Sequence, residues 1–179
     1  VGTHTIGYTD KIEVTLEGAY GATGYSELFK GTGTVTGFDR ANDKIYSADL
    51  NATTYERVNN GSLTINGVTV SDFNFAGDNN VKITDGNSTY TMVGKTINVT
   101  LNADLDGTYA AASGYAEVIT TQASASVQFT NTPTGTDTLA FEADADKLAY
   151  SRRNNDLVIT NNADPDNPIK TTVVDYYAA

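Results

Sequence analysis

A chain of 179 residues with 22 acidic and 11 basic side chains carries a formal net charge of −11 at pH 7. This charge repels phosphate backbones and anionic lipids, and no apolar run approaches the length of a membrane span, so we expect neither a nucleic-acid partner nor membrane insertion. Cysteine and tryptophan are absent and His4 is the one histidine, so Ser-His-Asp catalysis and histidine-based metal sites lack their residues, and we expect a protein that is not an enzyme.

Residues 1–11 are predicted to form an N-terminal arm. The stretch Val1-Gly-Thr-His-Thr-Ile6-Gly-Tyr8 alternates weakly between apolar and polar residues and is interrupted by glycine. An extended segment of this kind can add as a strand to an open sheet edge of a neighbouring subunit. We expect Ile6 and Tyr8 to enter surface pockets of that subunit and to mediate head-to-tail assembly. The alternative is an arm folded back on its own domain.

From Ile12 onward, short segments alternate between apolar and polar residues. A period of two is typical of strands with one buried face, so the sequence predicts an all-β fold. Asn66-Gly67 predicts a tight hairpin, and Asp85-Gly86-Asn87 predicts a second turn between strands. Only Tyr109 to Ala112 indicates a helical turn. The predicted architecture is an antiparallel β-sandwich, either jelly-roll or immunoglobulin-like, built from two related β-repeats.

The same β-motif occurs twice, roughly 100 residues apart. The matched pairs are Gly31 to Ile45 with Gly135 to Leu148, Asn59-Asn60 with Asn154-Asn155, Leu63 to Ile65 with Leu157 to Ile159, Thr69 to Phe73 with Thr172 to Tyr176, and Ile12 to Leu16 with Ile97 to Leu101. The repetition predicts β-repeat one over 12–95 and β-repeat two over 96–179, which could also form one continuous sandwich. It favours a structural or adhesive module, because an enzyme usually needs one asymmetric site. The alternative is chance similarity between strands rich in Thr and Asn.

Two acidic loops share the pattern N-x-D-x-D. Alternate oxygen-bearing side chains in a tight turn can converge on one point, as in the first half of many calcium loops. The tentative cofactor is therefore calcium, and its candidate ligands are Asn102, Asp104, Asp106, Asn162, Asp164 and Asp166. Neither loop has a glutamate at the twelfth position, so backbone carbonyls, water or a neighbouring strand must complete each site. The alternative is that these residues form ordinary turns through side-chain-to-backbone hydrogen bonds.

A third acidic cluster contains Glu142, Asp144 and Asp146. If this segment is a strand, the three carboxylates share one face at intervals of about 7 Å. Their mutual repulsion then favours either a bound cation or full solvation.

Thr36-Gly-Phe38 followed by Asp43-Lys-Ile45 is similar to the segment that follows the calcium-binding β-rolls of RTX-type secreted bacterial proteins. Asp146-Lys-Leu148, Asn155-Asp-Leu-Val-Ile159 and Val173-Val-Asp175-Tyr176-Tyr177 resemble the ending of their C-terminal regions. The resemblance implies type I secretion, extracellular residence and calcium-assisted folding. The glycine-rich nonapeptide that binds calcium in that family is absent, so no ligand is transferred from it.

These features predict a secreted structural subunit of an extracellular polymer, such as a surface layer (S-layer), filament or biofilm matrix. Such a subunit would self-assemble by β-strand contacts and be stabilised by calcium. The alternative is a ligand- or glycan-binding adhesive module of a larger surface protein. Its sugar-binding face would use tyrosines beside glycine-rich loops, for which the candidates are Tyr20, Tyr25, Tyr109 and Tyr115. Tyrosines of this kind also occur at strand surfaces and as interface residues.

Overall fold

The computed structural model describes residues 11–71, 73, 81–92, 95–112, 115–129 and 137–178. The chain separates into two compact units. Unit 1 contains Val1–Tyr55 and Ser62–Val93, and unit 2 contains Glu56–Gly61 and Gly94–Ala179. The regular elements among the described residues are strands and one 3-10 turn, so the all-β prediction is confirmed.

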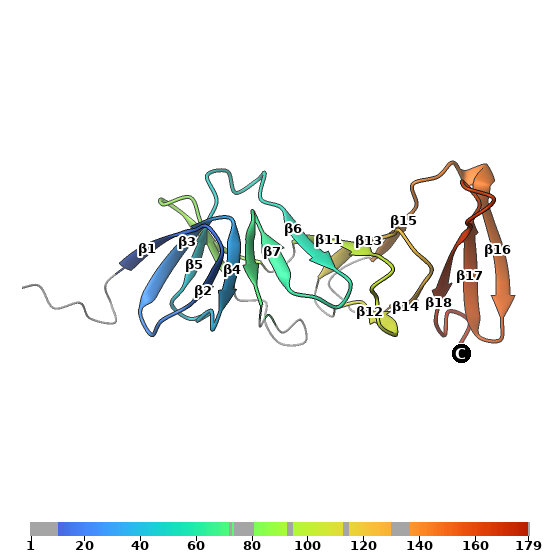
Figure 1. Ribbon diagram of the computed structural model, residues 1–179, viewed down its shortest axis with the longest axis horizontal. Helices are drawn as coiled ribbons and strands as arrows, with labels where there is room; N and C mark the ends of the chain where they lie inside the picture. The colour runs from blue at the N-terminus through green and yellow to red at the C-terminus, as the bar shows by residue number, and fades with distance from the viewer. Residues whose placement is uncertain are drawn as a thin grey trace, which may run out of the picture. The chain divides into compact units, whose positions relative to one another are not determined.

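Unit 1 has two sheets (Figure 1). Its strands are β1 (Lys11–Leu16), β2 (Ala19–Gly21), β3 (Ser26–Gly31), β4 (Gly33–Thr36), β5 (Lys44–Tyr46), β7 (Leu63–Ile65), β8 (Val68–Val70), β9 (Lys82–Thr84) and β10 (Thr89–Thr91). The first sheet has the order β1-β3-β5-β9-β10 and is parallel except for β10. The second has the order β2-β4-β8-β7, in which only β7 is antiparallel. From β1 to β5 the chain alternates between the two sheets, so each of these coils adds one strand to both.

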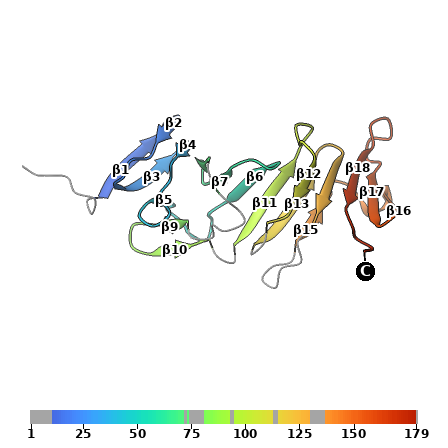
Figure 2. The same cartoon turned by 90° about the horizontal axis from the view of Figure 1, so that it is seen from below.

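Unit 2 has the same kind of paired sheets (Figure 2). Its elements are β6 (Tyr55–Val58), β11 (Thr96–Leu101), β12 (Thr108–Ala110), β13 (Ala116–Thr121), β14 (Ala125–Gln128), β15 (Thr138–Ala140), the 3-10 turn η1 (Ala145–Lys147), β16 (Leu148–Arg153), β17 (Asp156–Asn161) and β18 (Ile169–Val173). One sheet has the parallel order β6-β11-β13-β15. The other has the order β12-β14-β18-β17-β16, with β17 antiparallel to both of its neighbours.

The two units share one strand order. The series β1-β3-β5 corresponds to β11-β13-β15, and β2-β4-β8-β7 corresponds to β12-β14-β18-β17. This order makes Asp43, which precedes β5, equivalent to Asp137, which precedes β15. The sequence comparison had instead matched Asp43 with Asp146, which lies in η1. Short motifs such as Asp-Lys-Ile and Asp-Lys-Leu can recur by chance, whereas strand order is set by pairing along the whole repeat.

The predicted antiparallel sandwich is wrong, because most strand pairs are parallel. Period-two alternation reports a buried face but not the direction of the neighbouring strand, and antiparallel pairs are the commoner kind. The predicted hairpins at Asn66-Gly67 and Asp85-Gly86-Asn87 do form antiparallel pairs. The helical turn expected at Tyr109 is also wrong, since Tyr109 lies in β12.

The core consists of apolar ladders in which aligned strands place side chains one above another. In unit 1, Val14, Phe29, Ile45 and Ile83 occupy one ladder. In unit 2, Val99 pairs with Ile119 and Ile119 with Leu139. Fully burying a side chain of this size stabilises the fold by roughly 1.5–3 kcal/mol. Successive coils are therefore held together by apolar contacts as well as by strand hydrogen bonds.

A glycine permits the close stacking of the first two coils. The Thr34 N–H donates to the Gly18 carbonyl at 3.0 Å, which draws the two coil corners together. A Cβ atom at Gly33 would lie 2.1 Å from the Gly18 carbonyl oxygen. Only a residue without a side chain fits at position 33.

Candidate functional site

A buried polar network lies inside unit 1. The Tyr20 hydroxyl donates to Glu27 Oε1 at 2.8 Å, and the Thr23 N–H donates to Glu27 Oε2 at 2.8 Å. The Glu27 N–H in turn donates to Asp43 Oδ1 at 2.9 Å. Tyr20 from one sheet thus contacts Glu27 from the other sheet, and Asp43 of the next coil accepts the backbone N–H of Glu27.

Unit 2 repeats this network with different residues. The Tyr109 hydroxyl donates to Glu117 Oε1 at 2.8 Å, and the Ala112 N–H donates to Glu117 Oε2 at 3.0 Å. The Glu117 N–H donates to Asp137 Oδ1 at 3.0 Å. Sequence analysis missed both networks, although each has a tyrosine followed seven or eight residues later by a glutamate in a strand.

Unit 2 adds an arginine to its network. Arg57, on β6, donates from Nη1 to the Tyr109 hydroxyl at 3.0 Å, and its guanidinium lies 5.1 Å from the centre of the Tyr109 ring. Its Nε also donates to the Gly61 carbonyl at 3.1 Å. Arg57 reaches this position because β6 pairs in parallel with β11, with Arg57 aligned to Val99.

Burial controls the protonation of these groups. It raises the pKa of the carboxyls of Glu117, Asp137 and Asp43 above their ordinary values. The hydrogen bond to Glu27 raises the pKa of the Tyr20 phenol, and burial raises the pKa of Tyr109. Glu27 and Glu117 are only 1% and 0% exposed, so a dissolved substrate cannot reach their carboxylates. These carboxylates hold successive coils together.

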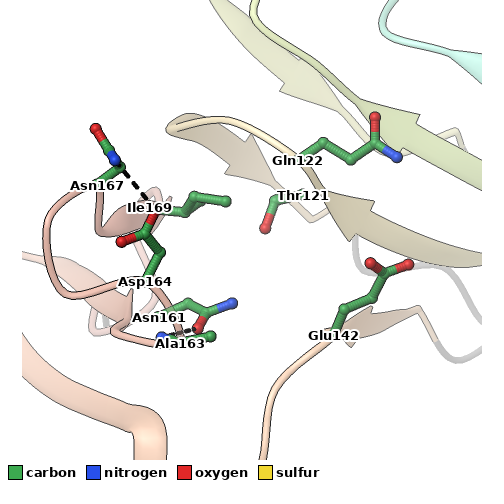
Figure 3. Close-up of a pocket in the computed structure, with 8 residues that line it drawn as sticks. All are labelled: Thr121, Gln122, Glu142, Asn161, Ala163, Asp164, Asn167 and Ile169. Atoms are coloured by element: carbon green, nitrogen blue, oxygen red, sulfur yellow. Dashed lines mark hydrogen bonds between the residues drawn. The ribbon is translucent and has the colours of Figure 1, made fainter.

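A surface hollow of about 240 Å³ lies within unit 2 (Figure 3). Its lining residues are Thr121, Gln122, Glu142, Asn161, Ala163, Asp164, Asn167 and Ile169. Figure 3 shows Glu142, on the segment after β15, across the hollow from the loop that carries Asp164. Asn167 donates from Nδ2 to Asp164 Oδ2 at 3.1 Å, and this hydrogen bond lowers the pKa of Asp164. The lining is rich in oxygen atoms, which suit a hard cation or a polar ligand.

The six predicted calcium ligands lie in two separate loops, and both loops contain turn hydrogen bonds. Asn102 Oδ1 accepts the Asp104 N–H at 3.0 Å, and Asp164 Oδ1 accepts the Asp166 N–H at 3.1 Å. Asp106 and Asn162 belong to the same two loops. In the part of the chain that the structure describes, no three Asp, Glu, His or Cys side chains gather in one metal-binding group. Glu142 and Asp164 line the same hollow from opposite sides, a combination that the loop motif did not predict.

The third predicted acidic cluster does not form on a strand. Asp146 lies in η1, where its carboxylate is 3.5 Å from Lys147 Nζ, and Asp144 is the residue before that turn. Only Glu142 of this cluster lines the hollow. Carboxylates on alternate residues lie on one face only in an extended strand. The segment that carries Glu142, Asp144 and Asp146 is not an extended strand, because it contains η1.

Two of the four tyrosines of the predicted sugar-binding face are buried. Tyr109 and Tyr115 are 0% and 1% exposed, so they cannot contact a glycan. Tyr20 and Tyr25 are half-buried. Within the described ranges, the exposed tyrosines are Tyr46, Tyr90, Tyr150, Tyr176 and Tyr177. The predicted assembly residues Ile6 and Tyr8 lie outside the described residues.

Comparison of the chain with family models, with curated proteins and with solved structures gives no match. Among the residues described, no helix is long and apolar enough to cross a membrane.

Proposed function

We propose that the chain is a secreted structural subunit of an extracellular polymer, of the surface-layer, filament or biofilm-matrix kind, which assembles through β-strand contacts. The observation that supports this proposal is a stack of mainly parallel coils whose sheets end in edge strands, β1 in unit 1 and β16 in unit 2. An edge strand presents unpaired backbone donors and acceptors that another strand can use. The buried Tyr-Glu-Asp networks serve to stack coils.

Calcium is part of the same proposal. The oxygen-lined hollow with Glu142 and Asp164 favours a bound cation, and a net charge of −11 makes cation binding favourable for the whole chain. Parallel coils are also the architecture of the calcium-binding repeats in RTX proteins. That similarity supports the resemblance, and with it secretion.

Concentration-dependent assembly tests the proposal. The purified chain, in calcium and in a chelator, is followed by light scattering and negative-stain electron microscopy. We expect ordered polymers above a critical concentration and a higher critical concentration in the chelator. A chain that stays monomeric in calcium at high concentration contradicts the proposed function.

The hollow also supports a second candidate, a glycan-binding adhesive module. Its amide and carboxylate side chains can hydrogen-bond sugar hydroxyls, although its lining contains no aromatic ring for stacking. Binding of a stable monomer to members of a glycan panel, lost in Asp164→Ala, would favour this candidate over the polymer.

A further inference from the structure

One six-residue motif occurs twice in the chain, once buried and once exposed. Tyr55-Glu-Arg57-Val-Asn59-Asn60 spans β6 and the turn after it, and Tyr150-Ser-Arg152-Arg-Asn154-Asn155 spans the end of β16 and its turn. The first asparagine of each turn has a positive φ, 49° at Asn59 and 57° at Asn154. β6 and β16 therefore have the same local structure and the same sequence pattern.

The environment of the two copies differs. Tyr55 and Arg57 are 5% and 8% exposed, whereas Tyr150 is 63% exposed and Arg152 is also exposed. The reason is the partner strand. β6 pairs with β11, and β16, which ends its sheet, pairs with β17 alone among the described residues.

Unit 1 has an edge strand, β1, that matches the partner which β16 lacks. β11 contains Ile97-Asn-Val99-Thr-Leu101, and β1 contains Ile12-Glu-Val14-Thr-Leu16. Ile97 and Val99 are buried between β6 and β13, whereas Ile12 and Val14 are half-buried because β1 pairs only with β3 in the described part of the chain. β1 therefore offers the strand that β16 lacks.

Among the described residues, the polar networks of the two units differ in their arginine. Arg57 covers Tyr109 in unit 2. Unit 1 has one arginine, Arg40, and it lies over Phe73, 6.0 Å from the ring centre. Tyr20, the counterpart of Tyr109, is half-buried. An arginine beside Tyr20 would occupy the position that Arg57 occupies beside Tyr109. In the second copy of the six-residue motif, the residue that corresponds to Arg57 is Arg152.

We propose that β16 of one copy of the chain pairs in parallel with β1 of a second copy, and that Arg152 of the first copy donates to the Tyr20 hydroxyl of the second. This inference rests on the proposed polymer function and specifies the strands through which neighbouring subunits contact each other. The register follows from β6 and β11, where Glu56 aligns with Asn98 and Arg57 with Val99. Transferred to the two edges, Ser151 aligns with Glu13 and Arg152 with Val14.

Charge and turn geometry agree with this pairing. The β16 edge carries Arg152 and Arg153, and the β1 edge ends at Glu17. Glu13 of β1 is already paired with Lys11 and Lys30, and Arg153 with Asp156, so the charge complementarity of the two edges rests on Arg152 and Glu17. Asn59 provides the model for the turn, because its N–H donates to the Thr100 carbonyl and its Oδ1 accepts the Asn102 N–H. Asn154 makes the same two bonds to Thr15 and Glu17 of the second copy. The contact is head-to-tail, so it extends a chain of copies or closes a ring.

Cysteine cross-linking tests the register directly, because the natural chain has no cysteine. One full-length chain carries Glu13→Cys and another carries Ser151→Cys, and the two are mixed under mild oxidation. Aligned residues on neighbouring strands lie about 4.8 Å apart, within disulfide range. We expect disulfide-linked dimers that contain one chain of each kind.

Two control pairs calibrate the cross-link. The double variant Glu56→Cys, Asn98→Cys should form an intramolecular disulfide, because these residues are aligned inside the chain. Lys11→Cys mixed with Ser151→Cys should cross-link weakly, since a shift of two residues adds about 6.6 Å along the strand. Equal cross-linking of Lys11→Cys and Glu13→Cys overturns the proposed register.

Arg152→Ala tests the arginine separately. We expect the critical concentration for assembly to rise by about tenfold or more, as for loss of an interface hot spot, while the melting temperature of the monomer changes little. In a double-variant cycle with Tyr20→Phe, the two effects on assembly should be non-additive, because they remove the same hydrogen bond.

The outcomes separate the contact from the function. If wild-type polymers form but Arg152→Ala assembles normally and the mixed cysteine chains do not cross-link, the contact is wrong and the proposed function stands. If deletion of residues 1–9 abolishes assembly under those conditions, the N-terminal arm is the contact. If no polymer forms but the cross-link does, the contact stands and the polymer function is wrong.

Discussion

At the residue scale, buried carboxylates in these coils act as hydrogen-bond acceptors for backbone groups and tyrosines. Glu27 and Glu117 each accept one hydroxyl and one backbone N–H with their two oxygens. An amide in place of such a carboxylate has one acceptor oxygen instead of two, so either the backbone N–H loses its acceptor or the tyrosine hydroxyl must turn to accept from the amide. The two networks therefore limit which polar groups can replace Glu27 and Glu117, just as the apolar ladders limit the size of the side chains that fit in the core.

Glu117→Gln should lower the free energy of unfolding by about 1–3 kcal/mol, because the single amide oxygen can accept only one of the hydrogen bonds from the Tyr109 hydroxyl and the Ala112 N–H. Glu27→Gln should cost a similar amount, since Thr23 donates to its second oxygen. Urea unfolding of the monomer measures both, with the exposed Glu56→Gln as the control. A control as destabilised as the buried variants would contradict this account.

Asp137→Asn should flatten the pH dependence of stability. Burial raises the pKa of Asp137, so between the ordinary carboxyl value near about 4 and the raised value the folded state holds more protons than the unfolded chain. Stability of the wild type therefore falls as pH rises through this window. The asparagine oxygen can still accept the Glu117 N–H but does not titrate.

Urea unfolding at several pH values between about 4 and 7 tests this expectation. Asp39, Asp85 and Asp164 have lowered pKa values and act in the opposite direction, with stability lost as pH falls. The informative quantity is therefore the difference between variant and wild type at each pH. Parallel profiles would show that Asp137 does not titrate in this range.

At the element scale, the stacking of coils depends on how closely their corners approach. Gly33 begins β4 and lies against the Gly18 carbonyl, at the corner of the preceding coil. Gly18→Ala and Gly33→Ala therefore form a matched pair, because a Cβ at Gly18 would meet no atom within 4 Å.

Gly33→Ala should destabilise unit 1 by several kcal/mol, or prevent its folding, since a Cβ 2.1 Å from a backbone oxygen forces the strands apart. Gly18→Ala should change stability by about 1 kcal/mol or less. Thermal unfolding followed by circular dichroism distinguishes the two. Equal melting temperatures would mean that the corner relaxes without cost.

At the scale of the whole molecule, the net charge of −11 opposes both folding and association through self-repulsion. Monovalent salt screens this repulsion, whereas calcium can also bind. The two effects are separable at matched ionic strength.

Calcium should raise the melting temperature more than sodium chloride of equal ionic strength, and chelation should reverse the increase. A ligand that binds only the folded state at a hundredfold excess over its Kd stabilises that state by about 2.7 kcal/mol. Glu142→Gln should reduce the calcium-specific part if the hollow holds the ion, while Asp85→Asn, in unit 1, should not. Identical melting in the two salts would leave screening as the whole effect.

The sequence by itself determined that the chain is all-β and where its tightest turns lie, because alternation and Asn-Gly pairs are local properties. The hairpin predicted over Leu63 to Phe73 forms between Leu63–Ile65 and Val68–Val70. The tertiary structure decided the direction of each strand relative to its neighbours, which strands pair, and which strands are buried. The alternation in Ile12 to Leu16 and Ile97 to Leu101 is the same, yet one strand is an edge and the other is central. Glu27 and Asp43 are 16 residues apart and meet only because parallel coils stack in register. That contact depends on chain length between coils, and no local pattern in the sequence reports it.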